Sequence, residues 1–257
     1  MRETYGSVLP GMDLSRLGGK LIVIEGSDGV GRSSQIGLLR PWLEQQGHAV
    51  LDTGMSRSAL AGKGIKRAKE GNTLGRITQS LFYATDFADR LEHEIVPALR
   101  AGFVVLTDRY VYSPMARAAV RGIDAAWTRK LYSFALKPDA VLYLRLTCEE
   151  LIPRVVFSHG FDYWESGADI YPGEDMFDSF CRYQAALLAE FDRLAEEYDF
   201  EVIDASGEID GTFKQLQRGV ARILRGDKRE PRVAPARAQT REDTGAEKTE
   251  KKSEAAS

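Results

Sequence analysis

The chain alternates short, continuous apolar runs with longer segments in which apolar residues recur every three or four positions. Runs without polar alternation are typical of strands buried on both faces of a parallel sheet, and the longer segments are typical of amphipathic helices. The pattern therefore predicts an α/β fold in which helices cover both faces of a five-stranded parallel sheet. The expected strands are 21–25, 49–52, 103–107, 140–146 and 201–203.

Helical periodicity fills most of the sequence between these runs. Pro41 lies inside the first helical segment, which begins near Ser33, and we expect it to kink or shorten that helix. Residues 157–174 contain several glycines and no helical pattern, and we interpret them as a lid. The other expected helices cover about residues 60–69, 77–99, 147–156, 176–198 and 207–224.

The two ends of the chain differ in composition from the middle. Residues 1–19 form a lead-in that is either a strand-like arm or loose chain, and residues 20–224 form the single domain. From Arg225 onward charges of both signs alternate, prolines occur and aromatic residues are absent. Such a composition cannot bury enough apolar surface to fold alone, so we expect 225–257 to be a disordered charged tail. A tail that folds on an unassigned partner is the alternative.

Charge and cysteine content narrow the class of protein. The 35 basic and 38 acidic residues nearly cancel, which gives no argument for binding to nucleic acid or to a membrane surface. No apolar run approaches the roughly 20 residues that span a bilayer. Cys148 and Cys181 do not have the spacing of metal ligands. The interpretation is a reduced, cytoplasmic protein.

The stretch 26–33, Gly-Ser-Asp-Gly-Val-Gly-Arg-Ser, directly follows the first apolar run. Its spacing, Gly-x4-Gly-x-Ser, is that of the P-loop, whose backbone amides hold phosphate at the start of a helix. In such a loop the Ser33 hydroxyl is a ligand of Mg²⁺. We expect the nucleotide phosphates to be bound by Gly26, Ser27, Gly29, Val30, Gly31, Arg32, Ser33 and Ser34.

Arg32 occupies the position at which the motif has a lysine. An arginine is always charged and its planar guanidinium carries several N–H donors, so it can bind phosphate oxygens. It is also longer than lysine, which alters the point-charge contact that a lysine makes between phosphates. The sequence therefore allows a repositioned transfer site that retains activity, or a site with weakened or lost catalysis.

Four segments, in this order along the chain, resemble the thymidylate kinases. They are the loop segment 24–35, the arginine segment Arg57-Ser58-x-x-x-Gly62-Lys63, the signature Asp108-Arg109-Tyr110-x-x-Ser113-x-x-Ala116, and Val202-Ile203-Asp204-Ala205. The similarity covers about residues 20–224. It implies a three-layer P-loop NTPase fold with a helical lid, ATP with Mg²⁺ as donor, and a nucleoside monophosphate as acceptor. It also implies a homodimer, with helix 77–99 as a candidate interface.

The resemblance also implies roles for individual residues. Asp28, Arg32, Asp108 and Arg109 are the implied catalytic residues, and Ser33 and Asp108 the implied metal ligands. Asp204 and Ala205 would lie on the adenine side of ATP. The implied acceptor site contains Arg57, Arg109 and Ser113 together with residues of the base and sugar pockets.

The acceptor-base pocket departs from the family pattern, which has an aromatic residue followed one turn later by an arginine. One alignment register selects Phe82 and Asp86, and counting back from Pro97 selects Tyr83 and Phe87; neither register supplies an arginine. If Asp86 faces the pocket, its carboxylate can only accept hydrogen bonds and should favour a base with an amino group. The alternative is that Asp86 lies on the solvent face of the helix.

Two further departures concern charge. Arg117 and Ala118 follow Ala116 where the family has a sugar-discriminating tyrosine and a glutamine. The lid carries no lysine or arginine between Phe157 and Phe180, so Arg32 is a candidate source of the charge that stabilises the transition state.

The sequence thus predicts transfer of the ATP γ-phosphate to dTMP or a related nucleoside monophosphate. An alternative from another class is a nucleotide-binding regulatory protein that has lost or redirected this transfer. A third possibility is a P-loop kinase with a non-nucleotide acceptor.

Overall fold

The computed structural model describes residues 2–72, 74–158 and 160–227, and the strands there form one parallel sheet with the order β2-β3-β1-β4-β5. All five predicted strands are confirmed to within two residues. Their bounds are β1 (Lys20–Glu25), β2 (Val50–Gly54), β3 (Val104–Asp108), β4 (Ala140–Arg145) and β5 (Glu201–Asp204).

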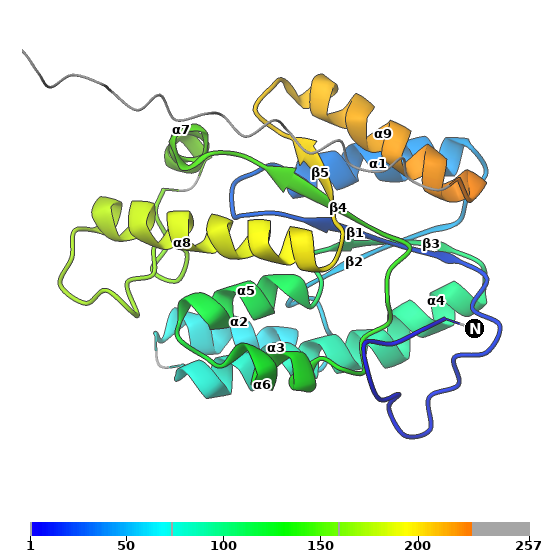
Figure 1. Cartoon of the computed structure of the whole chain (residues 1–257), viewed down its shortest axis with the longest axis horizontal. Helices are drawn as coiled ribbons and strands as arrows, with labels where there is room; N and C mark the ends of the chain where they lie inside the picture. The colour runs from blue at the N-terminus through cyan, green and yellow to red at the C-terminus, as the bar shows by residue number, and fades with distance from the viewer. Residues whose placement is uncertain (1, 73, 159, 228–257) are drawn as a thin grey trace, which may run out of the picture. The chain divides into compact units, whose positions relative to one another are not determined.

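Helices cover both faces of this sheet, so the predicted three-layer arrangement is confirmed (Figure 1). Ile22 and Ile24 of β1 point to one face and Leu21 and Val23 to the other, because successive side chains of a strand alternate. The first face packs against α1 (Arg32–Gln45), α7 (Cys148–Ser158) and α9 (Ile209–Arg225). The second packs against α3 (Arg76–Arg90), α4 (Val96–Arg100), α5 (Tyr112–Val120) and α8 (Met176–Glu197).

The register of the strands gathers the candidate residues at one edge of the sheet. Asp108, the last residue of β3, pairs with Ile24 of β1 and with Gly54 of β2. The loops that follow β1, β2 and β3 therefore leave the sheet side by side. Open parallel sheets bind ligands at this carboxyl edge.

Pro41 does not shorten the first helix, because α1 continues through Pro41 to Gln45, while the alternative expectation of a kink at Pro41 stays a prediction. A proline inside a helix crowds the carbonyl of the residue four positions earlier and leaves it without a donor. Here that residue is Gly37, and both Gly37 and Pro41 are exposed to solvent. Water can satisfy this carbonyl, and the absence of a side chain on Gly37 leaves room for the ring.

The described part of the N-terminal lead-in is a packed arm. Thr4 forms an isolated antiparallel bridge with Leu136, Tyr5 packs edge-on against Tyr112 and Tyr198, and Leu14 is buried. At the other end α9 extends to Arg225, one residue beyond the expected domain. Nearly all of the expected tail, residues 228–257, lies outside the described residues. Among those described, no helix is both long and apolar enough to cross a membrane.

The helical pattern at 77–99 is confirmed, but it contains a π-helical turn. The α-helix α3 passes into the π-helix η1 (Leu91–Ile95) and then into α4. A π turn contains one residue more than an α turn. It therefore shifts by one position which residues share a helix face before and after the turn. The two alignment registers of the base pocket differ by one residue, and the π turn lies between that pocket and Pro97.

We predict that deleting His93 closes the π turn and leaves the contacts on either side intact. His93 is exposed, so urea unfolding should show a loss of less than about 1 kcal/mol, as is usual for surface changes. The control is deletion of Thr85, which is also exposed but precedes Asp86 and Phe87. That deletion rotates both buried side chains away from their partners and should cost about 3 kcal/mol or more. Equal losses in the two variants would contradict the interpretation.

Candidate active site

The loop between β1 and α1 has the backbone geometry of an anion cradle. Gly26 has a φ of 148° and Gly31, at the N-terminus of α1, a φ of 100°. A side chain at Gly26 would also place its Cβ 2.8 Å from the carbonyl oxygen of Leu144. The first amides of α1 have no side-chain cap, and the buried hydroxyl of Ser27 has no hydrogen-bond partner within the described chain. These groups can bind phosphate.

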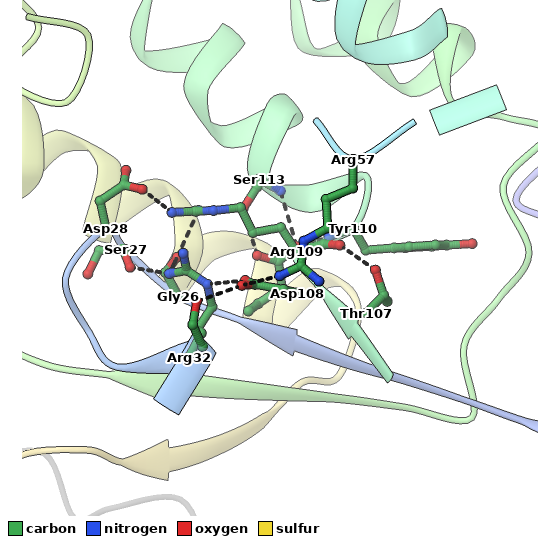
Figure 2. A network of polar contacts seen from close by, with 12 residues as sticks. Gly26, Ser27, Asp28, Arg32, Arg57, Thr107, Asp108, Arg109, Tyr110 and Ser113 are labelled. Atoms are coloured by element: carbon green, nitrogen blue, oxygen red, sulfur yellow. Dashed lines mark hydrogen bonds and ion pairs between the residues drawn. The ribbon is translucent and has the colours of Figure 1, made fainter. Parts of the chain in front are cut away.

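Arg32 is anchored beneath this loop by two of its three guanidinium nitrogens. Nε donates to Asp108 Oδ1 at 2.7 Å, and Nη1 donates to the carbonyl oxygens of Gly26, at 2.7 Å, and Ser27 (Figure 2). The neighbouring Ser33 donates its hydroxyl to Asp108 Oδ2 at 3.1 Å. No described residue accepts a hydrogen bond from the Nη2 group of Arg32, so the arginine fixes the loop and still offers donors to a phosphate oxygen.

Arg109 is held in a strained backbone conformation at the end of β3. Its φ of 69° lies in the left-handed region, which costs a non-glycine residue of order 1–3 kcal/mol. Glu25, fully buried, compensates by accepting hydrogen bonds from the Tyr110 amide at 2.8 Å and the Ser113 hydroxyl at 2.7 Å. Ser113 in turn accepts a hydrogen bond from Arg109 Nη1 at 2.9 Å. Ser113 thus orients Arg109.

Asp28 of the loop forms ion pairs with two arginines. Arg109 Nη2 contacts Oδ1, and Arg117 Nη2, from the middle of α5, contacts Oδ2 at 2.6 Å (Figure 2 shows the Arg109 side). Burial opposes ionisation of Asp28, but Arg109 and Arg117 hold the pKa of its carboxyl well below its usual range. Burial and repulsion from Arg32 lower the pKa of Arg109 to about 10, so an added anion would stabilise its charge.

Arg57 connects this cluster to a cavity of about 540 Å³. Its guanidinium pairs with Asp52 at 2.9 Å and reaches Asp108 Oδ2 at 3.6 Å, so it lies beside the carboxylate that holds Arg32. The described residues that line the cavity include four basic side chains and no acidic one. The lining consists of Ser56, Arg57, Ser58, Ala59, Gly62, Lys63, Ile65, Lys66 and Lys69.

Asp86 does not lie on the solvent face of its helix, so that alternative is wrong: it is fully buried. Its two oxygens accept hydrogen bonds from the amides of Ser56, at 3.0 Å, and Ser58, at 2.9 Å, and Oδ2 also pairs with Arg90 Nε at 3.0 Å. Asp86 therefore orders the loop that carries Arg57.

The three aromatic candidates of the base pocket differ in exposure. Tyr83 and Phe87 are buried, and Phe87 packs against Tyr110 in the main core. Phe82 is half-buried and packs on the small cluster around Ile65 of α2 (Gly62–Glu70). Of the three, Phe82 presents the most surface to a ligand.

A second cavity of about 500 Å³ lies on the other side of the P-loop. Arg154 of α7 crosses beside it, donating to the carbonyl oxygens of Ala205 at 2.8 Å and Val30 at 3.4 Å. Asp204 and Ala205 lie at the start of the lining loop, and Asp204 fixes it by accepting the Ser206 amide at 2.9 Å. The lining is Gly29, Val30, Gly31, Ser34, Gln35, Arg154, Ser206, Gly207, Glu208, Ile209 and Thr212.

The expected lid is fastened to the rest of the domain. Trp164 is buried and donates from its indole nitrogen to the carbonyl of Lys69 at 2.9 Å. Arg121 at the end of α5 forms a two-point ion pair with Asp169, at 2.8 and 3.0 Å. The described lid residues bring acidic rather than basic side chains to the site, including Glu165, which lies close enough to Asp28 and Arg117 to interact with their charges.

Sequence reasoning missed several residues that shape the site: Glu25, Arg121, Arg154, Trp164 and Glu165. Glu25 had a usable signal, because a carboxylate that ends a buried strand requires partners. The others depend on contacts between segments distant in the sequence, such as Trp164 with Lys69.

Comparison with known proteins agrees with this geometry. The family model "Thymidylate kinase" matches residues 24–215. A protein of Saccharolobus solfataricus named probable thymidylate kinase 2 is 40% identical over 208 residues, 80% of this chain and 95% of that protein. A probable thymidylate kinase of Thermococcus gammatolerans is 30% identical over 208 residues, which cover 77% and 94% of the two chains.

A thymidylate kinase of Clavibacter sepedonicus is 42% identical over 135 residues, half of this chain and 64% of its own length. The matched range includes the P-loop, the Arg57 segment, the Asp108-Arg109 signature and the loop after β5. The chain belongs to the thymidylate kinase family.

Proposed function

We propose that the protein transfers the γ-phosphoryl group of ATP to the phosphate of a nucleoside monophosphate, with dTMP as the first acceptor to test. As a member of its family it is a nucleoside monophosphate kinase resembling thymidylate kinase, which uses ATP and Mg²⁺. The observation that carries the proposal is that a charged cluster reaches one cavity of nucleotide size through Arg57 and is next to a second, which is lined by Gly31 and Ser34 on either side of Arg32 and Ser33. That cluster is Arg32, Ser33, Arg57, Asp108 and Arg109.

The cavity at Ser34 and Ser206–Ile209 suits the donor, since the P-loop amides beside it bind the ATP phosphates. Ser33 and Asp108 offer hydroxyl and carboxylate oxygens 3.1 Å apart, the ligand type that Mg²⁺ takes together with substrate phosphates. Bound there with ATP, Mg²⁺ neutralises charge on the phosphates. Asp204 and Ala205 support the loop on the adenine side.

The cavity at Arg57 suits the acceptor. Arg57 and Arg109 bind the acceptor phosphate and hold it in line with the ATP γ-phosphate, while Arg32 offers Nη2 to the group in transfer. Positioning and electrostatic stabilisation supply most of the rate in phosphoryl transfer, so no general base is required. We assign Asp28 to the acceptor sugar and Phe82 to the base, and Asp86 to the support of the Arg57 loop.

A panel of nucleoside monophosphates tests the function directly. With ATP and Mg²⁺, we expect ADP and a nucleoside diphosphate to form from dTMP or a close analogue, measured by a coupled assay and by chromatography of the products. The same panel is measured for binding by calorimetry. Binding of nucleotides without turnover of any acceptor would contradict the proposal and favour a regulatory protein.

Substitution of Arg32 tests its place in the mechanism. Arg32→Ala should lower kcat by about 10² to 10³, the usual loss for one donor to transition-state charge. Arg32→Lys keeps the charge but loses the planar guanidinium that joins Asp108 and Gly26. Its kcat should therefore lie between that of the wild type and that of Arg32→Ala. Arg40→Ala, which removes an exposed arginine of the same helix, is the control and should keep wild-type kcat. Normal turnover in Arg32→Ala would exclude the role.

We also infer that the protein is a homodimer that associates through α3. Ile77 and Leu81, one turn apart on this helix, are about half exposed. Light scattering should give twice the chain mass for the wild type and the single-chain mass for Ile77→Glu/Leu81→Glu. Leu60→Glu, at another exposed apolar residue, is the control and should stay dimeric. A wild type of single-chain mass would contradict the inference.

We place the protein in the cytoplasm, where ATP and nucleoside monophosphates occur. Cys148 and Cys181 are free thiols, although Cys148 Sγ approaches the carbonyl oxygen of Cys181 to 3.8 Å. Free neighbouring cysteines are consistent with a reducing compartment.

A further inference from the structure

Helix α2 presents a row of lysines that no acid neutralises. Lys63, Lys66 and Lys69 follow one another at intervals of three residues, so they lie on one side of the helix. All three line the cavity of about 540 Å³ that Arg57 also lines. Within the part of the chain that the structure describes, no acidic side chain forms an ion pair with any of the three lysines. This wall of the cavity therefore attracts anions.

Lys69 differs from the other two lysines in its surroundings. It is half-buried, whereas Lys63 and Lys66 are exposed. Its backbone carbonyl accepts the indole N–H of Trp164 at 2.9 Å, so the lid is fastened to the end of α2 that carries Lys69. Exclusion of water by the lid strengthens the action of a charge at this position.

The charge of Lys69 also acts on the P-loop. Burial raises the pKa of the Asp28 carboxyl, but neighbouring arginines and, with a smaller effect, Lys69 hold it well below its usual range. Asp28 belongs to the loop that binds the ATP phosphates, and Lys69 lines the cavity assigned to the acceptor. The Lys69 side chain is therefore within electrostatic reach of both substrates of the proposed reaction.

The charge of Lys69 is also free, unlike those of the arginines nearest the P-loop. Arg32 is paired with Asp108, and Arg109 with Asp28, so a carboxylate offsets each of these two guanidinium charges. In phosphoryl transfer, negative charge is spread over the three equatorial oxygens of the moving group. A cation without a carboxylate partner stabilises that charge with its full attraction.

We propose that Lys69 is a further catalytic residue, whose ammonium contacts the phosphoryl group as it passes from ATP to the acceptor. The assignment rests on the proposed function and adds a residue to its mechanism. An oxygen of the acceptor phosphate bonds to the γ-phosphorus while the bond from that phosphorus to the β–γ bridging oxygen breaks, and ADP leaves with the electron pair. Lys69 keeps its proton throughout. It supplies from α2 a charge that the lid, without lysine or arginine between Phe157 and Phe180, does not carry.

The first test measures turnover by the full-length protein with ATP, Mg²⁺ and the acceptor of the panel that reacts fastest. Lys69→Met should lower kcat by about 10² or more, the usual loss for one donor to transition-state charge, with a much smaller change in either KM. Lys69→Arg retains the charge and should recover part of the rate. Arg67→Met is the control, because Arg67 is exposed on the same helix and does not line the cavity; it should keep wild-type kcat.

The second test needs no turnover. ADP, aluminium fluoride and Mg²⁺ together with the acceptor mimic the group in transfer, and calorimetry compares their binding with that of ADP, Mg²⁺ and the acceptor alone. Lys69→Met should weaken binding of the mimic about tenfold or more and leave binding without aluminium fluoride unchanged. Trp164 bonds to the backbone of Lys69, so this variant retains the contact to the lid, and circular dichroism establishes that it is folded.

Two results would overturn the assignment. One is a Lys69→Met variant that turns over at the wild-type rate, which leaves the proposed function intact. The other is an equal loss of affinity with and without aluminium fluoride, which would mean that Lys69 only supports the cavity wall. If the wild type converts no acceptor but Lys69→Met weakens the mimic alone, Lys69 contacts the transfer position as proposed and the proposed function fails.

Discussion

The site depends on the ion pairs that Asp108 makes at the carboxyl edge of the sheet. This carboxylate accepts Arg32 Nε and the Ser33 hydroxyl and lies 3.6 Å from Arg57, so it joins the P-loop to the loop after β2. Arginines that approach one another repel, and burial adds the cost of desolvation. Both the desolvation and the repulsion contribute to the lowered pKa of Arg109. The carboxylates Asp28 and Asp108 offset them, which means that the cationic site requires its acids.

Hydrogen bonds around the site also impose the backbone conformation of Arg109. Arg109 adopts a positive φ, which would be lost if the surrounding contacts did not impose it. Glu25 at the end of β1 provides these contacts through Tyr110 and Ser113, and the Arg109 amide donates to the Ile24 carbonyl at 3.0 Å. The guanidinium is therefore positioned by the central strand of the sheet and not by a mobile loop. Precise placement of this kind is what phosphoryl transfer requires.

The fold was predictable because its signals are local. Continuous apolar runs such as 103–107 identify buried strands, and the glycine spacing of 26–31 identifies the P-loop without reference to the rest of the chain. That Pro41 would not end its helix could not be predicted, because the outcome depends on whether the carbonyl four residues earlier faces water. The role of Asp86 could not be read from helical periodicity either, since its partners are amides of a loop about 30 residues earlier. Contacts of this kind follow from the tertiary arrangement.

The ion-paired positive charges of this site lie on the sheet edge and on α5, which we call the floor, and not on the lid. The lid has no lysine or arginine between Phe157 and Phe180, and its Asp169 serves to fasten it to Arg121. The positive charges come instead from Arg32, Arg109 and Arg117, which ion pairs with Asp28 and Asp108 hold at the sheet edge and on α5. Basic side chains on a lid reach the substrates only when the lid closes. Basic side chains of the floor are in place before the substrates bind. For the proposed reaction this means that the electrostatic environment for transfer is preorganised by these arginines, and that the lid, which Trp164 and Asp169 hold against the domain, contributes by excluding water.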